Sequence, residues 1–144
     1  MPLSPRYRAW LYAAFTLLFL SGTAWFALDQ IGGGAAMGPW AGTATWLLMI
    51  HGGVAMPALM LLGALFPLHI QPSLRRAKNF GSGFTMLTVI GLLILTAFGL
   101  YYAGGESLRA WSSDLHIALG LAFPILLTAH ILWGKRDSLR RRLD

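Results

Sequence analysis

The stretch SDLHIALGLAFPILLTAHILWG, residues 113–134, decides the fold class of this chain. It carries a single formal charge, Asp114 near its start, and is otherwise almost entirely apolar. A membrane-spanning helix needs about 20 predominantly apolar residues, which this stretch supplies. Three further stretches have the same character, at about 9–28, 43–70 and 84–103. None shows the alternation of a membrane strand, and unpaired backbone groups are costly in hydrocarbon, so we predict four transmembrane helices.

The composition supports this prediction. Of 144 residues, 56% are hydrophobic and only 11% are charged, which is too apolar for a water-soluble domain of this size. We therefore expect an all-α integral membrane protein, with residues 1–144 forming one up-down-up-down four-helix bundle in contact with lipid. The first apolar stretch is longer than the core of a secretory signal, so we expect it to remain as a helix. We expect no internal repeat.

The connections between the predicted helices are short and rich in turn-forming residues. Short connections force consecutive helices to run antiparallel, which makes the second and fourth helices parallel to each other. Gly104 and Gly105 are expected to end the third helix, with Ser112 or Ser113 capping the fourth.

The formal net charge of +6 is distributed unevenly along the chain. Ten of the eleven basic residues flank the predicted spans on one side: Arg6, Arg8, Arg75, Arg76, Lys78, Lys135, Arg136, Arg140, Arg141 and Arg142. Only Arg109 lies in a loop on the other side. By the positive-inside rule, both termini and the loop between the second and third helices are cytoplasmic. The charge is thus a topology signal and a contact for anionic lipid, and we expect no nucleic-acid partner.

All four histidines lie in or at the ends of the predicted spans, where ligating side chains are costly and are candidates for function. His51 and His69 are 18 residues apart, which corresponds to five full turns of a regular helix. His116 and His130 are 14 residues apart, about 40° short of four turns. Each pair is therefore predicted to share one helix face.

Parallel second and fourth helices place the histidines in two pairs at two depths, His51 with His116 towards the outer side and His69 with His130 towards the cytoplasm. Two imidazoles that project from facing helices can supply the two axial ligands of haem iron. Because the chain has no cysteine, disulfides, iron–sulfur clusters and covalently attached c-type haem are excluded. We therefore predict haem b, with two haems or with one on His51 and His116 alone.

The spacings of the two pairs differ. At about 1.5 Å per residue, the sites would lie roughly 21 Å apart on the fourth helix and roughly 27 Å apart on the second. Kinks at Pro57, Pro67 and Pro124 are expected to absorb this difference.

Other residues are candidates for contact with the haem. Small residues beside the histidines, Gly52, Gly53, Gly63 and Gly120, leave room for a flat cofactor or for close helix packing. Basic residues near the membrane surfaces are available to bind the haem propionates: Arg75, Arg76, Arg109 and Arg136.

Two non-haem interpretations remain open from the residues alone. The histidines could be separate interhelical hydrogen-bonding residues, or they could bind zinc or copper in a transporter or assembly factor, because neutral imidazole suits both metals.

The segment HIALGLAFPILLTAH, from His116 to His130, and the segment MIHGGVAMPALMLLG around His51 resemble the small four-helix di-haem cytochrome b subunits of formate dehydrogenases, nickel–iron hydrogenases and related reductases. The resemblance implies a chain that passes electrons across the membrane between a partner redox protein and the quinone pool. It further implies a subunit of an oxidoreductase rather than a complete enzyme, in the bacterial inner membrane. The chain departs from this family in one respect. Those subunits commonly take a ligand from the first helix, which here has no histidine, so that His69 would replace it.

Overall fold

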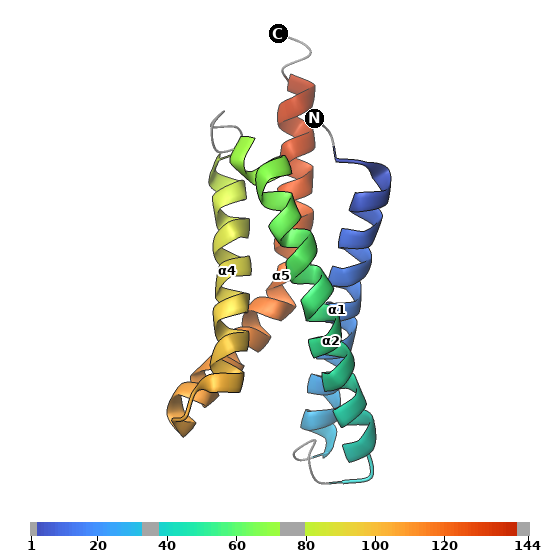
Figure 1. Ribbon diagram of the computed structural model, residues 1–144, viewed down its shortest axis with the longest axis vertical. Helices are drawn as coiled ribbons and strands as arrows, with labels where there is room; N and C mark the ends of the chain where they lie inside the picture. Colours follow the sequence, from blue (N-terminus) through green and yellow to red (C-terminus); the bar gives the residue numbers. More distant parts are fainter. Residues whose placement is uncertain (1–2, 33–37, 73–79, 141–144) are drawn as a thin grey trace. The chain divides into compact units, whose positions relative to one another are not determined.

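The computed structural model describes residues 3–32, 38–72 and 80–140, which are almost entirely helical. The elements are α1 Pro5–Gly32, α2 Ala41–Leu65, the π-helical segment η1 Phe66–Ile70, α4 Phe80–Tyr102 and α5 Glu106–Arg140 (Figure 1). Each predicted span corresponds to a helix long and apolar enough to cross a membrane, with α2 and η1 together forming the second. The predicted all-α class with four candidate membrane spans is confirmed.

The start of α5 differs from the sequence-based prediction. The helix begins at Glu106, directly after the two glycines, and Ser112 lies inside it rather than at its cap. The buried Ser112 hydroxyl donates a hydrogen bond to the carbonyl oxygen of Leu108, one turn earlier (2.8 Å). An intrahelical acceptor satisfies the serine hydroxyl, so the helix can run through this position.

The helices are grouped in two compact units, residues 1–71 and 72–144. In the first, α1 and α2 lie side by side as a hairpin (Figure 1), with Leu11 and Ala14 buried on α1, and Ala44 and Ala58 buried on α2. Small residues at such contacts let two helix backbones approach closely.

The second unit is the hairpin of α4 and α5 (Figure 1). Its buried apolar residues are Met86 and Val89 on α4 and Phe123 on α5. The prediction of one domain over residues 1–144 stays a prediction.

Many large apolar side chains point away from these helix contacts. Met60 is 76% exposed and Met56 is 69% exposed, and Trp46 and Trp111 on the same two histidine-bearing helices are 68% and 75% exposed. An apolar surface of this kind is what a lipid environment covers, because the solvent there is as apolar as the side chains.

The three prolines within the spans share a sequence context, since a glycine lies four residues before each. The pairs are Gly53 with Pro57, Gly63 with Pro67, and Gly120 with Pro124. A helical proline cannot bond to the carbonyl four residues earlier, and its ring crowds that carbonyl. Glycine is the residue whose backbone adjusts most easily to such crowding. This context allows α2 to continue through Pro57 and α5 through Pro124.

At Pro67 the helix changes type instead. The carbonyl of Gly63, which Pro67 cannot bond, accepts a hydrogen bond from the backbone N–H of Phe66, and residues Phe66–Ile70 form the π-helical segment η1. A π turn takes up about one residue more than an α turn, so side chains within it are rotated by up to about a quarter turn from their α-helical direction.

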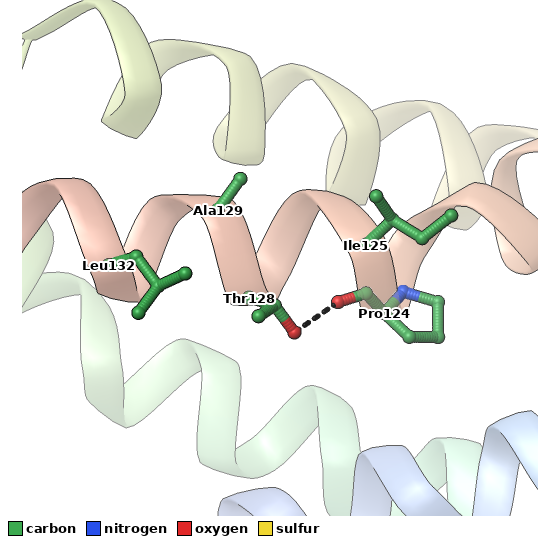
Figure 2. Close-up of a pocket in the computed structure, with 5 residues that line it drawn as sticks. All are labelled: Pro124, Ile125, Thr128, Ala129 and Leu132. Carbon is green, nitrogen blue, oxygen red and sulfur yellow. Dashed lines mark hydrogen bonds between the residues drawn. The ribbon is translucent and has the colours of Figure 1, made fainter.

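Helix α5 changes direction along its length (Figure 1), and a shallow apolar groove of about 450 Å³ lies along it. Figure 2 shows the residues that line this groove: Pro124, Ile125, Thr128, Ala129 and Leu132. The Thr128 hydroxyl donates to the Pro124 carbonyl at 2.8 Å. A proline and a hydroxyl that bonds to the preceding turn both bend a helix, so their combination explains the change of direction.

Candidate functional site

The His51 side chain on α2 is held by the backbone and a side chain of α1. Its Nδ1 lies 3.0 Å from the carbonyl oxygen of Leu18 and 3.1 Å from the hydroxyl oxygen of Ser21. Ser21 is only 5% exposed, and its hydroxyl also lies 2.7 Å from the Leu17 carbonyl oxygen. Two groups on one turn of α1 thus contact a single ring nitrogen.

These contacts identify the nitrogen that carries the proton. A carbonyl oxygen can only accept a hydrogen bond, so His51 Nδ1 must donate to Leu18. In the neutral ring the lone pair is then on Nε2, which is the form that a metal-ligating histidine takes when its other nitrogen is hydrogen-bonded.

A glycine provides the space for the His51 ring. A Cβ atom added to Gly22 would lie 3.0 Å from His51 Cε1 and 3.2 Å from Nδ1. These separations are shorter than normal van der Waals contact, so the imidazole lies directly against the α1 backbone. Ser21 therefore binds the His51 ring, and the absence of a side chain at Gly22 leaves the space that the ring occupies.

His116 is held in the second hairpin in a closely similar way. Its Nδ1 on α5 lies 3.0 Å from the hydroxyl oxygen of Thr96 on α4, and Thr96 is only 7% exposed. The Thr96 hydroxyl lies 2.7 Å from the carbonyl oxygen of Leu92, to which it donates its one proton. A Thr96 hydroxyl that donates to the backbone accepts from His116 Nδ1, and in that arrangement the lone pair of a neutral ring lies on Nε2.

His130, the second predicted ligand of α5, also contacts a hydroxyl of α4. Its Nδ1 lies 3.2 Å from the Ser82 hydroxyl oxygen, and the ring is half-buried. Three of the four predicted ligands are therefore bound at the same ring nitrogen by a hydroxyl of the preceding helix.

His69 differs from the other three. It lies in η1, its side chain is exposed, and it makes no hydrogen bond to another residue of the part that the structure describes. The prediction that His51 and His69 share one helix face assumed a regular α-helix over all 18 residues. The π segment Phe66–Ile70 interrupts that regularity, so the α-helical angle between the two residues no longer applies. The one-face prediction for this pair stays a prediction.

The predicted propionate-binding residues have different outcomes. Arg75 and Arg76 lie outside the described residues. Arg109 is exposed and donates from Nη2 to the carbonyl oxygen of Ala103, the residue directly after α4 (3.1 Å). Arg136 is exposed near the end of α5.

Three of the glycines on the histidine-bearing helices make no close contact within their own hairpin. A Cβ atom added to Gly53, Gly63 or Gly120 would meet nothing within 4 Å. Of the two explanations for these glycines, the one that invokes space beside the helix agrees with this geometry.

No group of three or more His, Cys, Asp or Glu side chains that could hold a metal ion is found among the described residues. Haem iron has a smaller requirement, because the porphyrin supplies four nitrogen ligands and the protein only the axial ones. Neutral imidazoles with Nδ1 bound and the lone pair on Nε2 match that requirement. The predicted pairing of His51 with His116, and of His69 with His130, joins residues of different units and stays a prediction.

Sequence reasoning missed the residues that hold the histidines: Leu18, Ser21, Gly22, Ser82 and Thr96. A serine or threonine inside an apolar helix is ordinary on its own, because it can bond to its own backbone. Comparison with known proteins adds no assignment: no family model, no curated protein and no solved structure matches the chain.

Proposed function

We propose that the chain is a membrane b-type cytochrome in which His51 and His116 are the axial ligands of one haem. The observation that carries this proposal is the identical state of the two histidines. In each, Nδ1 lies 3.0–3.1 Å from a buried hydroxyl of the preceding helix, a contact that in the neutral Nδ1–H tautomer leaves the lone pair on Nε2. Two separate structural histidines have no need to agree in tautomer.

The positions of the two histidines along their helices support the same conclusion. His51 follows Ala41, the first residue of α2, by ten residues, and His116 follows Glu106, the first residue of α5, by ten residues. At about 1.5 Å per residue, each lies roughly 15 Å along its helix. In parallel helices that enter the membrane from the same side, both imidazoles would lie in the outer part of their spans.

A bound haem would supply a one-electron Fe(III)/Fe(II) couple. The residues of this chain would bind and orient it: Nε2 of His51 and His116 would face the iron, while the apolar helices exclude water. The open space beside Gly53 and Gly120 suits a flat cofactor. The chain would then act as an electron-transfer subunit in the bacterial inner membrane, between a redox partner protein and the quinone pool.

A second haem on His69 and His130 is the extended form of this proposal. The contact between Ser82 and His130 favours it, because it repeats the arrangement at the outer histidines. His69 is exposed in η1, so one ligand of this second site is not held in place by a neighbouring hydroxyl as His51, His116 and His130 are.

The test is the visible spectrum and haem content of the full-length chain purified from membranes. We expect red protein with the split absorption bands of low-spin ferrous haem, and loss of the outer haem in His51→Ala and in His116→Ala. Ile50→Ala, which shortens an exposed neighbour of His51, is the matched control and should retain haem. Colourless wild-type protein that contains stoichiometric zinc or copper would overturn the proposal.

A further inference from the structure

The two hairpins carry matching sequence segments around the histidine contacts. Residues 17–21 of α1 read LLFLS and residues 92–96 of α4 read LLILT, each ending at the hydroxyl residue that binds a histidine. On the following helices, WLLMIH at 46–51 and WSSDLH at 111–116 each place a tryptophan five residues before that histidine. The similarity is confined to these short segments, and the expectation that the chain has no internal repeat stays a prediction. The connections differ in length, since 30 residues separate Ser21 from His51 and 20 separate Thr96 from His116.

The matching segments also make the same contacts. The Ser21 hydroxyl lies 2.7 Å from the carbonyl oxygen of the leucine four residues earlier, and 3.2 Å from that of the leucine three residues earlier. For Thr96 the corresponding distances are 2.7 Å and 3.1 Å. Ser21 and Thr96 are also two of only three buried polar residues among the side chains that the structure describes, the third being Ser112.

We infer that the two hairpins are equivalent ligand-presenting units, in which Ser21 and Thr96 are positioning residues for the haem ligands His51 and His116. This inference rests on the proposed function. Each hydroxyl gives its own proton to the helix backbone; Thr96 then accepts the Nδ1–H of His116, while Ser21 shares the Nδ1–H of His51 with the Leu18 carbonyl. Each hydroxyl therefore helps to hold the ring in one tautomer and one rotation within its own hairpin, together with the Leu18 carbonyl in the case of His51.

The same hydrogen bonds affect the redox equilibrium. A histidine that donates its Nδ1–H to an acceptor is a more basic ligand at Nε2. A more basic ligand stabilises ferric iron over ferrous iron, because ferric iron has the higher positive charge. Ser21 and Thr96 would therefore hold the reduction potential of the outer haem below the value it would have without them.

The experiment is a redox titration of the haem-loaded, full-length chain, with the ferric state also followed by electron paramagnetic resonance. Thr96→Val preserves the shape of the side chain and removes the hydroxyl, while Thr96→Ser keeps the hydroxyl. Ser21→Ala removes the hydroxyl from the first hairpin but leaves the Leu18 carbonyl bond to His51. Thr85→Val is the matched control, because Thr85 lies on α4 and bonds only to its own helix, at the Gly81 carbonyl (3.0 Å).

We expect Thr96→Val and Ser21→Ala to raise the ferrous-to-ferric ratio at the wild-type midpoint up to about tenfold, which is 59 mV for a one-electron couple. We expect Thr96→Ser and Thr85→Val to match wild type. If the redox titration shows two haem components, the one to follow is the component that disappears in His116→Ala. Loss of haem in Thr96→Val with retention in Thr96→Ser would also support the inference.

Three results would overturn the inference while leaving the proposed function intact. The first is a wild-type potential and resonance spectrum in both Thr96→Val and Ser21→Ala. The second is the same shift in Thr85→Val. The third is loss of haem in both Thr96 variants, since the shape of threonine would then matter and not its hydroxyl. Wild-type protein without haem would overturn the proposed function itself, and the inference with it.

Discussion

The imidazole of His51 lies against the backbone of Gly22, so closely that an added Cβ would come within 3.0 Å of Cε1. In most helices, replacing glycine by alanine is favourable by about 1 kcal/mol, because the unfolded chain becomes less flexible. At Gly22 that gain is opposed by the contact with the ring. Helix propensity and ligand position therefore act in opposite directions at this residue.

The first prediction concerns this contact. We expect Gly22→Ala to retain haem with an altered ferric resonance spectrum, because the ring must shift by a few tenths of an ångström. We expect Gly22→Val to lose the outer haem, because a branched side chain fills the space of the ring. Haem content per chain is the measurement. Gly91→Val is the control, since a Cβ added there meets nothing within 4 Å. Equal haem contents in the two valine variants would contradict the prediction.

The second prediction concerns the number of haems. If His69 and His130 bind a second haem, His69→Ala and His130→Ala should each reduce the haem content by half. The pyridine haemochrome assay, expressed per chain, measures this. Unchanged haem in both variants would contradict a second site and leave a single haem on His51 and His116. Ile131→Ala, a half-buried neighbour of His130, should not change the count in either case.

The third prediction concerns the packing of α1 on α2. Ala58 is 3% exposed, and Ala44, which lies 14 residues earlier, is 2% exposed. Ala58→Leu should lower the free energy of unfolding by about 1–3 kcal/mol, because the larger side chain must separate the two helices. Ala64→Leu, at an exposed position of α2, should change it little. Denaturant unfolding in detergent measures both variants, and equal stabilities would show that α1 does not pack on α2 at Ala58.

The fourth prediction concerns orientation in the membrane. Because the chain has no cysteine, single-cysteine variants report on one position each. Glu106→Cys should react with a membrane-impermeant thiol reagent applied from outside intact cells, and Lys135→Cys should react only after the cells are opened. The distribution of basic residues is the physical reason. The opposite labelling pattern would reverse the topology.

Much of the fold could be predicted from the sequence, because a membrane helix requires only a sufficient length of apolar residues. All four spans were found, and the boundaries were missed mainly where a helix continues past its apolar part. The start of α5 is the clearest case. Residues 106–112 are too polar for a span but form a regular helix. The negative charge of Glu106 in the first turn stabilises the helix by its interaction with the helix dipole.

The candidate ligands were also evident from the sequence, because a histidine inside an apolar span is rare and costly. Their local geometry was not. Regular helix periodicity predicted a common face for His51 and His69, but it did not predict the π segment at Pro67 between them. Periodicity arguments hold only while the helix type does not change, and one extra residue in a turn is enough to redirect every side chain after it.

The sequence by itself determined that the chain has four apolar spans and that the second and fourth carry two histidines each. Hydrophobicity and residue type can be read position by position. Only the tertiary structure decided which hydroxyl meets which ring: Ser21 with His51, Thr96 with His116 and Ser82 with His130. Those contacts depend on how two neighbouring helices are rotated and offset along each other. Side-chain packing between the helices sets that rotation and offset, and no single helix contains the information.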